Sequence, residues 1–128
     1  MTILPLYAAL LTLLFLALSV RALRLRGRFQ VAVGDGGQPA LLRAIRAHGN
    51  FAEYVPLALI LIGLVESGGG PGWLVHALGA ALLIGRLAHA WGVSQVRETL
   101  QFRVVGMVLT FSVLTVASLL LLARVLGA

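Results

Sequence analysis

The amino-acid sequence predicts an all-α integral membrane protein, a four-helix bundle that forms a single domain over residues 1–128. Of the 128 residues, 60% are hydrophobic and 11% are charged, and the mean hydropathy is +1.03. This composition is unlike that of a soluble domain, so the chain needs lipid as its solvent. Two charge-free apolar stretches, 3–20 and 104–123, have about the length that crosses the hydrocarbon core of a bilayer. Two others, 51–65 and 72–96, reach that length only by including ionisable residues, and function is expected there.

The first helix is expected over about residues 3–24. Its apolar run starts almost at the N-terminus, has no basic residue before it and is followed by arginines. A secretory signal has the opposite order, with basic residues first and a shorter apolar run. We therefore interpret this segment as a retained transmembrane helix.

The second helix is expected over about residues 39–66, with Pro39 at the first helical position, where its missing N–H is tolerated. Four polar residues near its start fall within about 80° of one another around the helix axis. They are Arg43, Arg46, Asn50 and Glu53. Beyond them the helix is apolar and contains Pro56, which is expected to kink it. A polar stripe against lipid is unfavourable, so this stripe should face other helices.

The third helix is expected over about residues 72–96, after the tight hairpin ESGGGPG. Arg86 and His89 lie three residues apart and therefore on one helix face. Arg86 lies roughly 21 Å along the helix from the hairpin, below the membrane surface, so it needs a partner, and Glu53 is the expected one. Such a pair fits a structural ion pair as well as a catalytic one. For His89, a hydrogen-bonded interior role is favoured over metal ligation, and no metal site is predicted, because no second ligand stands at metal spacing.

The fourth helix is expected over about residues 102–125, and Arg103 stands at its start. Together with the polar residues of the two middle helices, Arg103 forms a cluster at one end of the bundle. This cluster has more positive than negative charge. It therefore suits an anionic ligand with carboxylates, because guanidinium groups bind carboxylates through paired hydrogen bonds.

The arginines set the expected orientation in the membrane. They concentrate in the first and third connections, and the second connection has none. By the positive-inside rule, the first and third connections are cytoplasmic and both termini are non-cytoplasmic, with only Arg124 in disagreement. The formal charge of +6 comes from ten arginines and no lysine. Topology and lipid head groups explain this charge, so nucleic-acid binding is not predicted.

The sequence contains no cysteine. Disulfides, a thiolate nucleophile and cysteine-based metal sites are therefore excluded. Any thiol chemistry needs a thiol that a bound molecule supplies.

Three segments resemble the MAPEG family, the membrane-associated proteins in eicosanoid and glutathione metabolism. They are RAIRAHGNFAEYVPLALIL, GRLAHAWG and FRVVGM, in that order along the chain. The short GDGG connection is most similar to the small bacterial branch of the family. The resemblance implies a four-helix protomer that assembles as a homotrimer in a bacterial inner membrane. It also implies a glutathione cofactor bound between neighbouring subunits near the cytoplasmic surface.

The resemblance assigns roles to seven residues. Arg21 would hold a glutathione carboxylate, and Arg103 would stand beside the thiol as the catalytic residue. A cation there favours the thiolate, which is the nucleophilic form. The other ligand-contacting positions are Arg46, Asn50, Glu53, Arg86 and His89.

Three positions depart from the pattern of the glutathione-active members. Gly49 stands where those members have an additional arginine, and Val93 and Met107 stand where they have aromatic hydroxyls. These departures bear on whether glutathione binds and whether the chain is catalytic, because a fold can be inherited without its site.

The function that the resemblance implies is a membrane-bound glutathione-dependent transferase or peroxidase that acts on lipophilic electrophiles. The alternative is a non-catalytic MAPEG-fold protein that binds membrane lipids or serves as a scaffold. A third class, the small four-helix drug–proton exporters, needs an acidic residue near the midplane of an early helix. The first helix has none, and Glu53 stands beside arginines that would repel cationic drugs.

Overall fold

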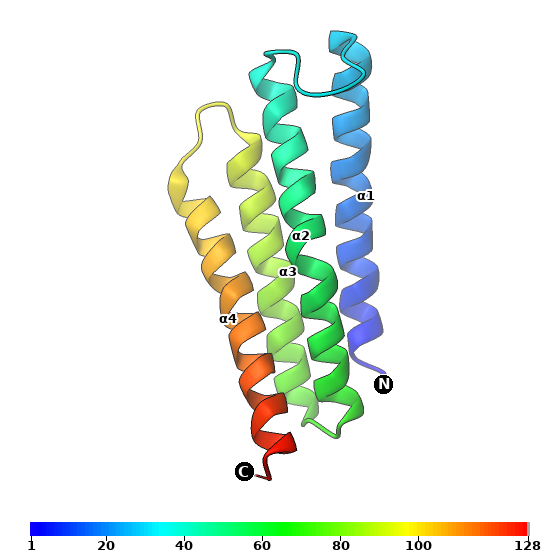
Figure 1. The fold of residues 1–128 in the computed structure, drawn as a ribbon, viewed down its shortest axis with the longest axis vertical. Coiled ribbons are helices and arrows are strands. Elements are labelled where there is room, and N and C mark those ends of the chain that lie inside the picture. Colours follow the sequence, from blue (N-terminus) through cyan, green and yellow to red (C-terminus); the bar gives the residue numbers. More distant parts are fainter. Residues whose placement is uncertain (128) are drawn as a thin grey trace.

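The computed structural model describes residues 1–127, which form four long helices (Figure 1). The helices are α1 (Leu4–Phe29), α2 (Pro39–Ser67), α3 (Gly72–Ser94) and α4 (Leu100–Val125), and the described residues include no strand. Each helix is long and apolar enough to cross a membrane. The predicted all-α class and the four membrane-spanning helices are therefore confirmed.

Local sequence chemistry explains where the helices begin and end. α2 starts with Pro39 in its first turn and continues through Pro56. α1 continues to Phe29, beyond its expected end near residue 24, because the polar segment RLRGRF leaves the apolar span but contains good helix formers. Arg26 in this extension donates a hydrogen bond to the carbonyl oxygen of Gly34 at 2.8 Å. The last turns of α1 are thereby tied to the connection that follows.

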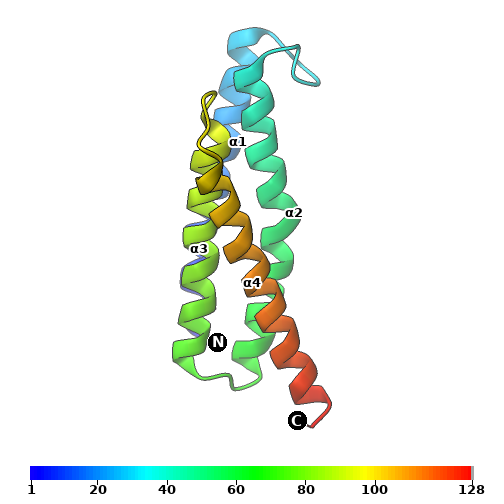
Figure 2. The same cartoon turned by 90° about the vertical axis from the view of Figure 1, so that its left-hand side faces the viewer.

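The helices alternate in direction, so both termini lie at the same end as the α2–α3 hairpin (Figure 1). α2 and α3 pack against each other, α1 packs against both of them, and α4 also packs against both. Within the described chain, α1 and α4 make no contact with each other. Figure 2 shows α4 crossing the bundle obliquely. The four helices therefore form an open arrangement rather than a closed ring.

Two glycines bring α3 and α4 close together. A Cβ atom on Gly106 would lie 2.5 Å from the carbonyl oxygen of Gly85 and 2.6 Å from the Cβ of His89. A Cβ atom on Gly85 would lie 2.9 Å from the Cβ of Leu109. Small residues commonly allow such close backbone approach where membrane helices pack. This crossing holds Arg86 and His89 of α3 directly against α4.

The end of the bundle that contains the termini is fastened by Glu66. Its carboxylate accepts hydrogen bonds from the backbone N–H groups of Thr2, Ile3 and Leu4, at 2.6, 2.8 and 2.8 Å. N–H groups at the start of a helix have no partner within that helix. The last turn of α2 thus caps α1, and we assign Glu66 a structural role.

Candidate functional site

The predicted site residues gather toward the end of the bundle that is opposite the termini. They come from the last turns of α1 and α3 and from the first half of α2 and of α4. Arg86 lies deepest, roughly 12 Å below the end of α3 at Ser94. The site therefore has a buried layer around Arg86 and an outer layer near the helix ends.

Arg86 is a buried cation with neutral partners. It is 1% exposed, its Nη2 donates to Asn50 Oδ1 at 2.6 Å, and its Nη1 donates to Thr110 Oγ1 at 3.3 Å. Its guanidinium carbon lies 5.9 Å from the centre of the Phe51 ring, a cation–π contact. Within residues 1–127, its Nε has no hydrogen-bond partner and no carboxylate pairs with it. The bundle interior therefore carries a positive charge that no negative side chain balances.

The expected pairing of Arg86 with Glu53 is wrong. Glu53 instead pairs with Arg46 at 3.7 Å, and both side chains are about half exposed. An ion pair with Arg86 would require the Glu53 carboxylate to lose its solvation, whereas the neutral Asn50 amide accepts the hydrogen bond at a lower desolvation cost. The polar stripe of α2 is therefore divided: Asn50 binds Arg86 in the interior, whereas Arg46 and Glu53 pair with each other at the surface.

His89 lies in the interior, as expected, and is 2% exposed. Its Nδ1 has no hydrogen-bond partner among the described residues, which differs from the hydrogen-bonded role expected for it. The described residues contain no cluster of three His, Cys, Asp or Glu side chains that is suited to a metal ion. His89 therefore adds a ring nitrogen without a hydrogen-bond partner in the described chain to the layer around Arg86.

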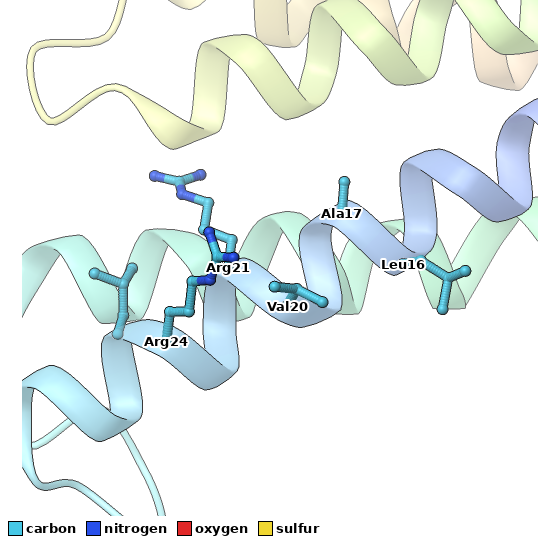
Figure 3. Close-up of a pocket in the computed structure, with 6 residues that line it drawn as sticks. Leu16, Ala17, Val20, Arg21 and Arg24 are labelled. Carbon is cyan, nitrogen blue, oxygen red and sulfur yellow. The ribbon is translucent and has the colours of Figure 1, made fainter.

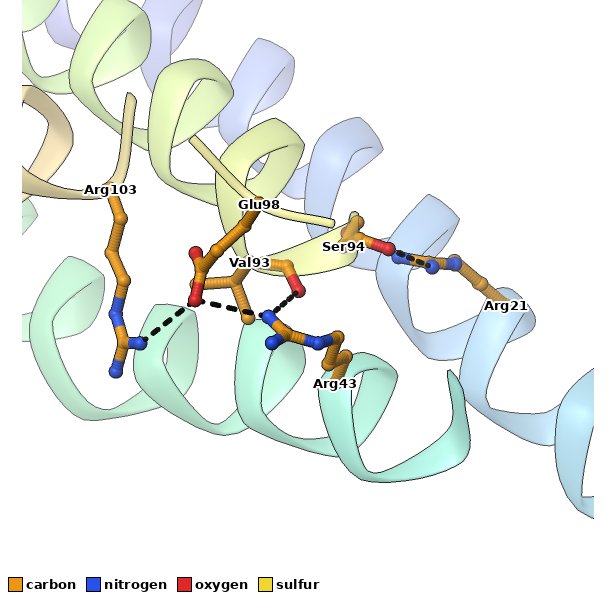
Figure 4. A network of polar contacts seen from close by, with 6 residues as sticks. All are labelled: Arg21, Arg43, Val93, Ser94, Glu98 and Arg103. Atoms are coloured by element: carbon orange, nitrogen blue, oxygen red, sulfur yellow. Dashed lines mark hydrogen bonds and ion pairs between the residues drawn. The ribbon is translucent and has the colours of Figure 1, made fainter. Parts of the chain in front are cut away.

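The outer layer centres on Glu98, which lies between α3 and α4 (Figure 4). Its Oε1 accepts from Nη1 of Arg43 at 3.1 Å and from Nη1 of Arg103 at 3.3 Å. Arg43 also donates to the carbonyl oxygen of Val93 at 3.2 Å. One carboxylate oxygen thereby joins the start of α2 to the start of α4.

The sequence placed Arg43 in the polar stripe of α2 without a ligand contact of its own, and Glu98 was not predicted to belong to the site. The one available signal was that Glu98 is the only carboxylate in the arginine-containing third connection. The hydrogen bond from Arg43 is the main cause that lowers the pKa of Glu98; partial burial opposes it, and the charges of Arg43 and Arg103 reinforce it. Glu98 is therefore ionised at neutral pH.

Arg21 lies on a different side of the bundle. It donates to the hydroxyl of Ser94 and, at 3.2 Å, to the carbonyl oxygen of Ser94 (Figure 4). Arg21 thus binds the carbonyl end of α3, where a cation is favourable. Because α1 does not contact α4 in the described chain, one protomer does not bring Arg21 and Arg103 together.

Two hollows on the surface of the bundle include Arg21. One, of about 540 Å³, runs along α1 and is also lined by Val20 and Arg24 (Figure 3). The other, of about 350 Å³, lies between α1 and α3, with Leu18 and Trp91 among its apolar lining residues. Each hollow combines an apolar wall with a cation at the polar end of the bundle.

The three departures from the family pattern lie beside these groups. A Cβ atom on Gly49 would have only Arg46 Nη1, at 3.6 Å, and Glu53 Oε1, at 4.0 Å, within reach, so the position is open. Val93 is buried, and Met107 places its Sδ 3.9 Å from Nη1 of Arg86. Neither supplies a hydroxyl to the site.

Comparison with known proteins gives one family match and close bacterial relatives. The model of the MAPEG family matches residues 4–123. Inner membrane protein YecN of Escherichia coli strain K12 is 47% identical over 87 residues, and so is the protein of the same name from Escherichia coli strain CFT073. Each match covers 68% of this chain and 66%, just under two thirds, of the relative.

Proposed function

The chain belongs to the MAPEG family, and from this premise we propose that it is a membrane-bound glutathione-dependent transferase or peroxidase that acts on lipophilic electrophiles. The observation that carries the proposal is the charge at the polar end of the bundle. Within the site described above, five arginines stand with two glutamates, Glu53 and Glu98. The arginines are Arg21, Arg43, Arg46, Arg86 and Arg103. Glutathione fits this excess because it carries carboxylates and ionises further as a thiolate.

Five polar residues have a chemical role in the proposal. Glutathione, when bound, supplies the thiol that the chain itself lacks. Arg103 is half exposed at the start of α4, where its charge favours the ionised form of a nearby thiol. Arg46 and Asn50 bind polar groups of the ligand, and the Glu53 carboxylate accepts hydrogen bonds from an amino group. The buried charge of Arg86 keeps the potential in the site positive.

The proposed assembly is the homotrimer that the family resemblance implies, and the separation of Arg21 from Arg103 supports sites shared between subunits. If neighbouring protomers pack α1 of one against α4 of the next, Arg21 of one subunit lies beside Arg103 of another. The ligand would then bind between subunits, with its carboxylate held by Arg21. The open arrangement, in which α1 and α4 do not touch within a protomer, leaves both helices available for this contact.

The surroundings of the helices fit substrates that arrive through lipid. Large apolar side chains on all four helices face outward, including Leu13, Ile60, Ile84 and Val108. We place the protein in a bacterial inner membrane with the arginine-rich end cytoplasmic and both termini non-cytoplasmic. Lipophilic electrophiles dissolved in the bilayer would then reach Arg103 from the side.

The test uses the protein purified in detergent. Millimolar glutathione should raise the melting temperature, and the protein should conjugate a generic electrophile such as chlorodinitrobenzene. Arg103→Ala should lower kcat by at least tenfold, roughly the loss of one charge-stabilising group. Arg124→Ala, which removes the same charge at the opposite end of the bundle, is the matched control and should retain activity. Absence of any thermal response to millimolar glutathione would contradict the proposal.

The second candidate function is a non-catalytic protein that binds lipid or serves as a scaffold. The open position at Gly49 and the lack of hydroxyls at Val93 and Met107 favour it. It predicts that acyl lipid copurifies with the protein and that Arg103→Ala does not change lipid retention. Turnover in the unmodified protein that disappears in Arg103→Ala would rule it out.

A further inference from the structure

Arg43 and Arg103 are far apart in the sequence but lie close together in the structure. They belong to α2 and α4, yet their Nη1 atoms lie 3.1 and 3.3 Å from the same oxygen, Oε1 of Glu98. Two guanidinium groups that converge on one oxygen make a geometry that suits a carboxylate. In the proposed glutathione site Arg43 adds positive charge but has no ligand contact of its own, and apart from Glu98 its one partner in the described chain is the carbonyl oxygen of Val93.

Glu98 fills the pair only in part. Its Oε1 accepts both ion-pair contacts, whereas its Oε2 is buried and has no partner among the described residues. Glu98 also lies in the connection between α3 and α4 rather than in a helix, and connections move more readily than the helices they join. The lowered pKa of Glu98 keeps it anionic at neutral pH. The arginine pair therefore holds an anion that the chain itself supplies.

We propose that Arg43 and Arg103 form a carboxylate subsite, that Glu98 fills it in the ligand-free protein, and that a carboxylate of the bound ligand displaces Glu98. The inference rests on the proposed function, because it takes a small anionic peptide such as glutathione as the ligand. Only Nη1 of Arg103 contacts Glu98, and a guanidinium has five N–H donors. Arg103 therefore binds the carboxylate and keeps donors for a second group, such as the thiolate.

If the ligand displaces Glu98, removing the Glu98 charge should raise the affinity for the ligand. A ligand must break two charged contacts of Glu98 before its carboxylate can bind the two arginines. Its measured affinity is therefore lower than it would be if Glu98 did not fill the subsite. If Glu98 instead only holds the two arginines in position, its removal weakens binding. The two roles therefore predict opposite effects of the same substitution.

The experiment compares four proteins by thermal unfolding during ligand titration. They are the unmodified protein, Glu98→Gln, the double variant Arg43→Gln/Glu98→Gln and the control Asp35→Asn. Glu98→Gln removes the charge and keeps the shape of the side chain. Asp35→Asn removes the same charge from the α1–α2 connection, where Asp35 contacts only local backbone. The probes are glutathione and glutarate, a dicarboxylate without a thiol.

Glu98→Gln should reach half-maximal stabilisation at a concentration of either probe roughly three- to tenfold lower than the unmodified protein. The double variant should lose this gain, and Asp35→Asn should resemble the unmodified protein. If Glu98→Gln needs the same or a higher concentration of both probes, the inference is overturned. If glutathione stabilises none of the proteins while glutarate still binds Glu98→Gln more tightly, the proposed function fails and the subsite stands.

Discussion

Replacing Asn50 with alanine tests the buried layer of the site. Asn50 Oδ1 is the nearest acceptor of Arg86, 2.6 Å from Nη2, and Arg86 is 1% exposed, so water does not replace the lost partner. A hydrogen bond to a charged group contributes about 1.5–3 kcal/mol in soluble proteins. Hydrogen bonds between membrane helices average about 0.6 kcal/mol and reach about 1.7 kcal/mol. We therefore expect Asn50→Ala to lower the free energy of unfolding by about 1–2 kcal/mol, near the upper end of the membrane range.

The assay is reversible unfolding from detergent micelles, followed by circular dichroism, in a double-mutant cycle with Arg86→Met. Methionine removes the buried charge and retains a long flexible side chain, so the double variant leaves no unpaired cation in the interior. The coupling between Asn50 and Arg86 should be about 1 kcal/mol. Glu53→Gln is the control and should change stability by less than about 0.5 kcal/mol, because Glu53 does not touch Arg86.

Two results would refute this reasoning. One is additivity of Asn50→Ala and Arg86→Met within about 0.5 kcal/mol, which would mean that the two side chains do not depend on each other. The other is a larger loss for Glu53→Gln than for Asn50→Ala. That result would restore the ion pair between Glu53 and Arg86 that the structure lacks.

Two further predictions concern the α3–α4 crossing and the outer layer. Gly106→Ala should lower the free energy of unfolding by about 1–3 kcal/mol, because its Cβ would meet the Gly85 carbonyl oxygen. Gly27→Ala is the control and should not lower the free energy of unfolding, because a Cβ there has nothing within 4 Å. Equal losses for the two variants would contradict the close α3–α4 crossing. Glu98 has a folded-state pKa below its ordinary value of 4.5, so its stabilising effect is present above that value and is lost as the pH falls through the folded-state pKa. The melting temperature of the unmodified protein should therefore fall more steeply with acidification than that of Glu98→Gln; parallel curves would show that the ion pairs contribute nothing.

The sequence was sufficient for the fold because hydropathy alone marks spans of this length. Lipid requires helices to satisfy their own backbone hydrogen bonds, so an apolar stretch in the membrane has few alternatives. The depth of Arg86 was also predictable, since it follows from counting residues along a helix. In contrast, the end of α1 was missed because apolar length and helical length differ where arginines continue the helix.

The side-chain partners were less predictable because they depend on how helices cross. Arg86 meets Thr110 because Gly85 and Gly106 bring α3 against α4, and it meets Asn50 where α3 packs against α2. Periodicity places Asn50 and Glu53 on one face of α2, but it does not say which of them lies deeper against a neighbour. The role of Glu98 depends on the path of a connection, which no helical period describes.

The lack of contact between α1 and α4 also bears on how the chain is built during synthesis. Each helix packs against the one before it, and the remaining contacts join helices two apart in sequence. The contacts of α1 within the protomer can therefore all form before α4 emerges from the ribosome. Interactions between neighbours in sequence close short loops and form quickly. We expect α1, α2 and α3 to assemble first as a platform, with α4 docking last onto the α2–α3 side while the outer face of α1 is still open to lipid.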